Sequence, residues 1–175
     1  MNTILRLRCL PSAVRAFLIG CVLSVGASSA SAFNINIGGH GAILTQGAGQ
    51  STVVELVENP DGTLNLSAEQ SGSLAHLGKF TGSFEYIATI DYNTGTTFIG
   101  GEGEIRLASG KIFVEVQLVE VGIDYPRPYT GILRITGGTG SFAKAKGFFE
   151  ITGVDEESLT DRFVLVGLVL NVAKK

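Results

Sequence analysis

Apolar and polar residues alternate with a period of two along most of the chain beyond residue 50. The segment Lys111–Val121 shows this clearly, with Ile112, Val114, Val116 and Leu118 on one face and Glu115 and Gln117 on the other. Successive side chains of a β-strand point to opposite faces of a sheet, whereas those of a helix repeat about every 3.6 residues. No segment shows a convincing helical period, so the pattern predicts an all-β protein.

The alternation predicts eight strands, at 51–58, 63–70, 80–92, 96–107, 111–121, 129–136, 145–153 and 161–172. Turn residues separate most of them, as in Asn59-Pro60-Asp61-Gly62, where proline presets φ and glycine accepts a positive φ. Strands joined by short connections pair antiparallel, and eight of them close into a small barrel. An eight-stranded antiparallel barrel is therefore expected, with a two-sheet sandwich as the alternative.

Three segments interrupt or extend this pattern. Gly100-Gly101 and Gly103 predict a bend or bulge within their strand, and the two prolines of Asp124–Pro128 predict a loop. The segment Phe33–Gly49 is either a loose arm or a strand that plugs the barrel or pairs with an edge. The last strand contains FVLVGLVL, which is apolar on both faces. An exposed outer face would form a large apolar patch, so a homo-oligomer is expected, with cover by the arm that starts at Phe33 as the alternative.

The first 32 residues have the features of a cleaved signal peptide. Arg6, Arg8 and Arg15 precede an apolar stretch that is too short to span a bilayer, and Ala30-Ser31-Ala32 fits a small-x-small cleavage site. Lipoprotein processing at Cys21 is the less favoured interpretation. The expected mature chain is a single barrel domain of residues 33–175, exported to the periplasm or secreted, with no membrane span.

Composition then narrows the functional classes. Without three signal-peptide arginines, 10 of the 13 Lys and Arg remain against 16 Asp and Glu, a formal charge of −6. No basic stripe is available for phosphates, so nucleic acid is not an expected partner. Both cysteines, Cys9 and Cys21, lie in the removed segment, which excludes disulfides and thiolate chemistry in the mature chain. We predict neither a metal site nor a cofactor.

Four residues are candidates for contact with a ligand. His76 precedes a strand, where a proton-transfer role competes with a more common structural one. Glu115 becomes a functional candidate if its face looks into the barrel, and an ordinary solvent-exposed residue if it looks outward. Arg134 or Glu115 directed inward beside Tyr86 would indicate a ligand cavity. The acidic run Asp155-Glu156-Glu157 is read as a solvated loop rather than a calcium site.

A glycine motif, Gly138-Thr139-Gly140-Ser141-Phe142, follows the strand-like residues ILRIT. In a dinucleotide-binding fingerprint such glycines open a helix within a βαβ unit. The residues that follow, AKAKGFFEITG, are rich in β-formers and are not helical. The motif is therefore predicted to be a turn between antiparallel strands.

The longer segment ITGGTGSFAKAKG at 135–147 resembles the turn between late strands in dirigent proteins and the allene oxide cyclase barrel-like family. The matching positions, all structural, are Gly137, Gly138, Gly140, Phe142 and Gly147. The segment AHLGKFT at 75–81 is similar to one found in exported bacterial members of that group. The resemblance implies an eight-stranded calycin-like barrel, often trimeric, with a mostly apolar cavity.

Three functional hypotheses follow. The first is an exported barrel that binds a small hydrophobic ligand in its interior or at its mouth. The second, implied by the resemblance, is a cyclase-like or dirigent-like enzyme that steers the cyclisation or coupling of a reactive hydrophobic intermediate. The third is a non-catalytic interaction protein with a solid barrel. A cavity favours the first two hypotheses, and a barrel packed shut with aliphatic side chains favours the third.

Overall fold

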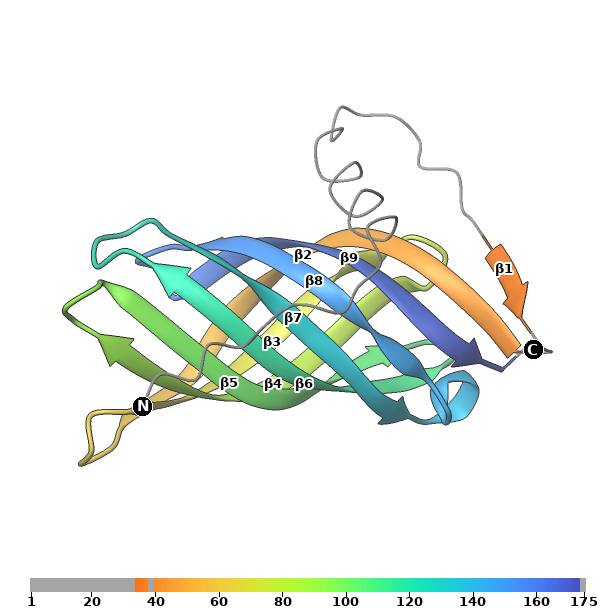
Figure 1. Ribbon diagram of the computed structural model, residues 1–175, viewed down its shortest axis with the longest axis horizontal. Coiled ribbons are helices and arrows are strands. Elements are labelled where there is room, and N and C mark those ends of the chain that lie inside the picture. The colour runs from red at the N-terminus through yellow and green to blue at the C-terminus, as the bar shows by residue number, and fades with distance from the viewer. Residues whose placement is uncertain (1–33, 38–39, 174–175) are drawn as a thin grey trace, which may run out of the picture. The chain divides into compact units, whose positions relative to one another are not determined.

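The computed structural model describes residues 34–37 and 40–173 (Figure 1). The predicted signal peptide lies outside these residues. The strands are β1 (Asn34–Ile37), β2 (His40–Glu58), β3 (Leu64–Leu74), β4 (Gly78–Asp91), β5 (Thr96–Leu107), β6 (Gly110–Val121), β7 (Arg127–Gly138), β8 (Lys146–Asp155) and β9 (Thr160–Val172). A short 3-10 helix, η1 (Gly140–Phe142), separates β7 from β8.

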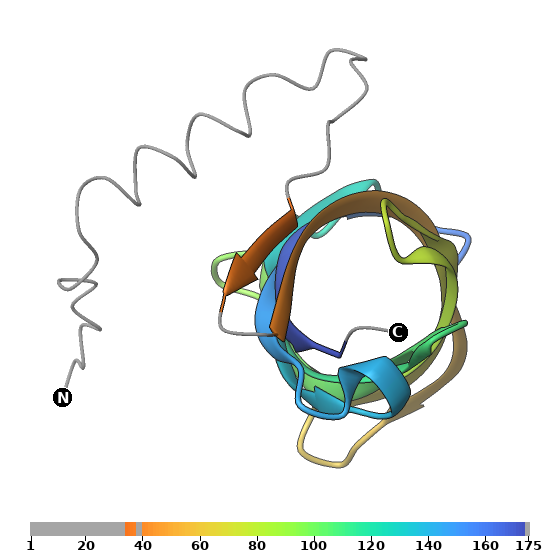
Figure 2. The same ribbon diagram turned by 90° about the vertical axis from the view of Figure 1, so that its right-hand side faces the viewer.

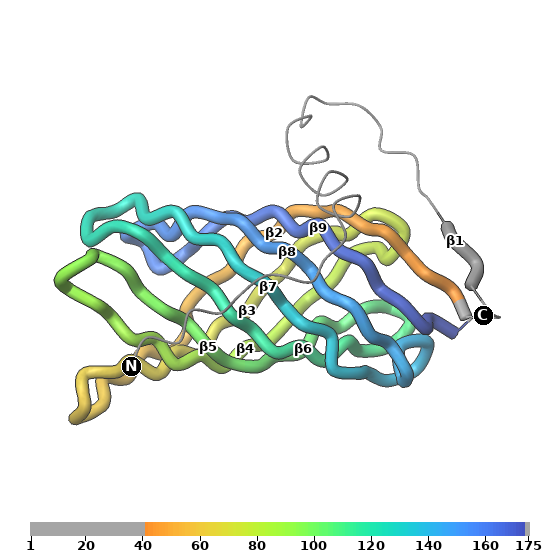
Figure 3. The backbone as a smooth tube through the Cα atoms, viewed as in Figure 1, coloured from red at the N-terminus to blue at the C-terminus, as the bar shows by residue number. Residues whose placement is uncertain are grey.

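Strands β2 to β9 form a closed antiparallel barrel. Each strand pairs with its neighbour in sequence, and β2 also pairs with β9, which closes the ring seen end-on in Figure 2. The predicted eight-stranded barrel is confirmed, and the sandwich alternative is wrong. The tube in Figure 3 shows the hairpin-to-hairpin path of the chain around the wall. Within the described residues no helix is long and apolar enough to cross a membrane.

The two ends of the barrel differ. We call the mouth the end formed by the connections at 59–63, 92–95, 122–126 and 156–159, on the left of Figure 1. The opposite end carries η1, whose Phe142 is buried in the core. There the GGTGSF segment connects two antiparallel strands, as predicted, and Gly140 and Gly147 both have positive φ values, at 58° and 128°.

Apolar side chains fill the middle of the barrel. The aliphatic face of β6 points inward, because Ile112, Val114, Val116 and Leu118 are all buried. Aromatic rings from other strands, including Phe84 and Phe149, complete the core and are almost fully removed from solvent. Burial of this apolar surface is the main stabilising contribution to such a fold.

Every aromatic side chain that points inward from a described strand stands opposite a glycine on a neighbouring strand. The register pairs are Phe80–Gly72, Phe84–Gly103, Tyr86–Gly101, Tyr129–Gly153, Phe149–Gly167 and Phe163–Gly49. A Cβ at Gly103 would lie 2.2 Å from the Phe84 ring, and one at Gly167 would lie 2.3 Å from the Phe149 ring. These glycines provide space for rings within a narrow barrel. The prediction of a bulge at Gly100–Gly103 is wrong, since β5 keeps an unbroken register with β4 and β6.

The chain before residue 51 forms strands rather than a loose arm. Residues 41–52 of β2 pair with β9, and β1 pairs with the first residues of β2. Of the alternatives for Phe33–Gly49, strand pairing is confirmed for the described part. The predicted loop at Asp124–Pro128 is too long, because β7 begins at Arg127, and Pro128 is its second residue, near the strand start that proline tolerates.

Candidate functional site at the mouth of the barrel

The inward face of the wall becomes polar at the mouth. Four consecutive strands each direct a charged side chain inward at this end, namely Glu120 on β6, Arg127 on β7, Asp155 on β8 and Asp161 on β9. In each strand the residue continues the alternation of the apolar residues that fill the core. Glu120 is only 4% exposed, although carboxylates are seldom buried without a partner.

Arg127 links two of these carboxylates. Its Nη1 lies 3.1 Å from Oε1 of Glu120, and its Nη2 donates to Asp155 and, at 2.8 Å, to the hydroxyl of Tyr125. The guanidinium carbon also lies 4.1 Å from the centre of the Tyr125 ring, which is a cation–π contact. Nε of Arg127 is buried without a hydrogen-bond partner among the described residues. The ion pairs hold the guanidinium just inside the mouth, beneath Tyr125.

Asp161 belongs to a second group of polar side chains slightly deeper in the barrel. It accepts a hydrogen bond from the Tyr129 hydroxyl, and the Ser51 hydroxyl also favours its charged form. Nearby, Gln70 donates to the Tyr86 hydroxyl at 3.1 Å. Burial raises the pKa of Asp161, and burial with the nearby Asp161 charge raises the pKa of both tyrosines. Both tyrosines therefore keep their hydroxyl protons, and Tyr129 donates its proton to Asp161 whereas Tyr86 accepts a hydrogen bond from Gln70.

The carboxyl of Glu120 ionises at a higher pH than an ordinary glutamate. Burial raises the pKa of this carboxyl to about 7, against the opposing effect of Arg127, and the neighbouring Asp155 and Asp161 add to the increase. A carboxyl that titrates near neutrality can donate or accept a proton at physiological pH. Such perturbed groups gather at functional sites more often than elsewhere, although structural ion-pair networks also produce them.

Exposed apolar side chains surround this polar group on the rim of the mouth. They are Leu56, Tyr92, Ile123, Tyr125 and Leu159, which come from the end of β2 and from three of the mouth connections and are between 41% and 73% exposed. Single exposed apolar residues are common on protein surfaces, but here they share one end of the barrel. An apolar border around a few convergent polar groups is typical of a small-molecule site.

The four residues predicted from the sequence do not converge on one site. His76 is exposed, with a positive φ of 64°, in the turn between β3 and β4 at the end opposite the mouth. Tyr86 points inward and hydrogen-bonds Gln70. Glu115 and Arg134 form an ion pair with each other on the outer wall, where their side chains are 50% and 68% exposed. The outward alternative for Glu115 is thus the observed one.

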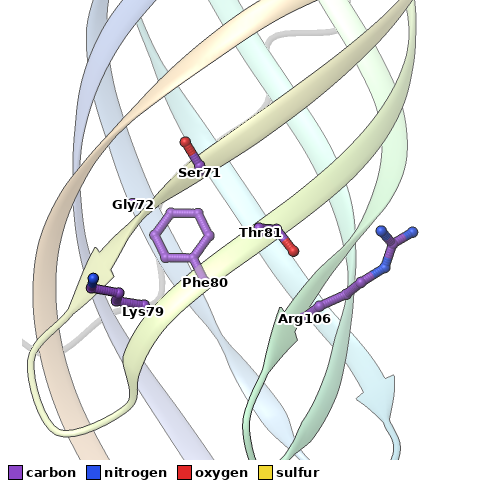
Figure 4. A pocket seen from close by; sticks show the side chains of 6 residues that line it. All are labelled: Ser71, Gly72, Lys79, Phe80, Thr81 and Arg106. Atoms are coloured by element: carbon purple, nitrogen blue, oxygen red, sulfur yellow. The ribbon is translucent and has the colours of Figure 1, made fainter.

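Two shallow hollows lie on the outer wall. One, of about 670 Å³, is lined by residues of β2 to β6 that include Glu55, Glu85, Glu102 and Glu115. The other, of about 470 Å³, lies over β3 to β5, with Lys79 and Arg106 on opposite sides of Ser71 and Thr81 (Figure 4). Arg106 is already paired with Glu104. In the larger hollow Glu85, Glu102 and Glu115 stand side by side on β4, β5 and β6 and face outward, whereas the charged residues of the mouth point into the barrel.

The mouth residues were missed from the sequence because each stands at the end of a strand. Arg127 and Asp155 fell in segments predicted to be loops, and Glu120 and Asp161 lay at the ends of the predicted strands 111–121 and 161–172 and were not singled out. The alternation could have placed Glu120 on the inward face, since it lies two residues beyond Leu118 in β6. Among the described residues, no group of three or more His, Cys, Asp or Glu is placed to hold a metal ion.

No family model matches this chain, and no curated protein matches it. Among solved structures, the chain is similar to the pterocarpan synthase dirigent protein GePTS1, at 12% sequence identity and a TM-score of 0.43 over 85% of this chain and 91% of that one. A closed antiparallel barrel of eight strands is the fold that the resemblance in residues 135–147 implied. The architecture of this chain is consistent with that of a dirigent-like barrel.

Proposed function

We propose that this protein is an exported barrel that binds a small hydrophobic ligand at its mouth. The observation that carries the proposal is the position of Glu120, Arg127, Asp155 and Asp161, which enter one end of the barrel from four consecutive strands inside an apolar rim. The middle of the barrel is filled with side chains. The ligand therefore contacts the rim and the polar groups directly below it, rather than a deep central cavity.

A second candidate function is a dirigent-like enzyme that steers a reactive hydrophobic intermediate. Its support is Glu120, whose pKa of about 7 suits it to proton transfer at the mouth. Tyr129, hydrogen-bonded to Asp161, supplies a second oriented hydroxyl. In this case the mouth holds its guest in one orientation, which by itself accelerates a reaction or selects its product.

The third hypothesis, a solid barrel that acts through its outer surface, draws support from the filled core. It leaves unexplained why four charged side chains point inward at one end of the barrel. A protein that works only through its wall has no need of a desolvated Glu120 at the mouth, since burial of a carboxyl is costly.

The test is native mass spectrometry of mature residues 33–175, purified gently from the source cells. The expected result is an assembly mass above the summed subunits, with a small molecule released on denaturation. Ile123→Glu, on the rim, should abolish the bound guest, whereas Ile87→Glu, on the outer wall with similar exposure (57% against 63%), should retain it. Retention of the guest by both variants would place the ligand elsewhere, and its absence from the wild-type protein would remove the support for a tightly held ligand.

A further inference from the structure

The mouth holds an excess of negative charge. Three carboxylates, on Glu120, Asp155 and Asp161, face inward there with one guanidinium, on Arg127. Arg127 forms ion pairs with both Glu120 and Asp155. Asp161 accepts a hydrogen bond from the neutral Tyr129 hydroxyl. Within the described part of the chain, no lysine or arginine forms an ion pair with Asp161. With a proton on Glu120 and both aspartates ionised, the mouth has a net charge of −1.

Arg127 is poorly placed to receive an anionic ligand. Both terminal nitrogens of its guanidinium already contact protein oxygens, on Glu120, Asp155 and Tyr125. Its Nε is enclosed by protein. A carboxylate or phosphate entering the mouth would have to displace one of these partners and would meet the uncompensated charge of Asp161, so repulsion disfavours that class of ligand.

On the basis of the proposed function, we infer that the ligand of the mouth is a cationic amphiphile, with a protonated amine head and an apolar body. An ammonium group offers three N–H donors and no acceptor, which matches carboxylate oxygens that lack a cation. The apolar body fits the rim formed by Leu56, Ile123 and Leu159. Charge-assisted hydrogen bonds of this kind are about twice as strong as neutral ones.

Binding of a cation is coupled to the proton on Glu120. The groups that face this carboxyl are Thr97 on β5, Arg127 and Tyr129 on β7, Asp155 on β8 and Asp161 on β9. A cation beside these carboxylates favours the ionised form of Glu120, so amine binding releases a proton. Because an alkylamine stays protonated below pH 9, its affinity should rise about fivefold between pH 6 and pH 8.

The test compares octylamine, octanol and octanoate, which have similar apolar chains and carry an amine, a hydroxyl and a carboxylate head group. Binding to the mature chain is measured by calorimetry in two buffers of different ionisation enthalpy, and amide chemical shifts locate the site. Octylamine should bind at least about tenfold more tightly than octanol, with proton release, and octanoate should bind most weakly. Equal affinity for octanol and octylamine, or tighter binding of octanoate, would overturn the inference while leaving mouth binding intact.

Two variants separate charge from shape. Asp161→Asn should reduce the affinity for octylamine about tenfold toward that of octanol and leave octanol binding unchanged. The control Glu102→Gln, which removes a carboxylate from the outer wall, should change neither. If Asp161→Asn fails to fold, Glu120→Gln replaces it and should abolish the proton release. Failure of all three probes to shift mouth resonances would overturn the inference, whereas the proposed function is decided separately by the guest in native mass spectrometry.

Discussion

The ring of Phe84 stands directly opposite Gly103 on the neighbouring strand, so closely that a Cβ at Gly103 would lie 2.2 Å from Cδ1 of the ring. The same pairing recurs for the other inward aromatic residues of the strands. The large rings that fill the barrel therefore fit because the residue opposite each of them, on the neighbouring strand, has no side chain. Glycine in a strand interior normally destabilises it, and here the packed ring offsets that cost.

Gly103→Ala should therefore destabilise the barrel by about 2 kcal/mol, in the range usual for overpacked cores. Gly100→Ala is the matched control, because this glycine lies three residues earlier in β5 and has open space where a Cβ would be placed. The control should be neutral or stabilising by about 0.5 kcal/mol, since alanine loses less backbone freedom on folding. Urea denaturation of both variants measures the difference, and equal stabilities would show that the ring moves aside freely.

Glu120 should make stability depend on pH in the direction opposite to that of an ordinary surface carboxylate. Its pKa is about 7 in the folded protein against an ordinary 4.5, so the folded state binds the proton more tightly. The free energy of unfolding should fall as pH rises from about 4.5 to about 7, by about 2 to 3 kcal/mol. Denaturation of wild type and Glu120→Gln across this range isolates the contribution, and parallel curves for the two proteins would contradict the shift.

Two arginine–carboxylate pairs on β7 allow a direct comparison of burial. Arg127→Met leaves Glu120 and Asp155 without their cation inside the mouth and should cost about 3 kcal/mol, more at pH 8 than at pH 5 because Glu120 ionises. Arg134→Met breaks an exposed pair with Glu115 and should cost less than about 1 kcal/mol. Thermal denaturation measures both, and similar losses would mean that the mouth pair is effectively solvated.

The outer face of β9 supports the homo-oligomer expected from the sequence, which we retain as a proposal. Val164 and Val166 are 52% and 44% exposed on that face. Val166→Lys should convert the assembly to monomers, whereas Thr81→Lys, on the exposed face of β4, should not. Light scattering of residues 33–175 measures the mass, and a monomeric wild type would end the proposal.

Strand order and facing could be predicted from the sequence because the alternation of apolar residues is long and regular. In β6 the alternation placed Val114 and Val116 on one face and Glu115 on the other, and the aliphatic face is the one that is buried. The role of Gly101 and Gly103 in β5 could not be recognised, because their partners, Phe84 and Tyr86, lie on a different strand and cannot be matched before the register is known. Local patterns do not contain such cross-strand pairings.

The mouth could not be predicted for a related reason. A charged residue at the end of an apolar strand looks like the beginning of a solvated loop, and Asp155 was read in this way. Only closure of the barrel brings Glu120, Arg127 and Asp155 together, since β6, β7 and β8 place these three residues at one end. The sequence contains the charges but not their convergence.

The barrel closes only when β2 pairs with β9, the last strand in the chain. Ser51 stands opposite Asp161, which lies 110 positions later in the chain, and contacts between such distant residues form late because a long loop must first be ordered. Until the last strand is in place, β2 has an open edge and the mouth lacks Asp161. A chain that stops before β9 would lack both a closed wall and a finished site, so assembly and binding competence should arise in the same final step.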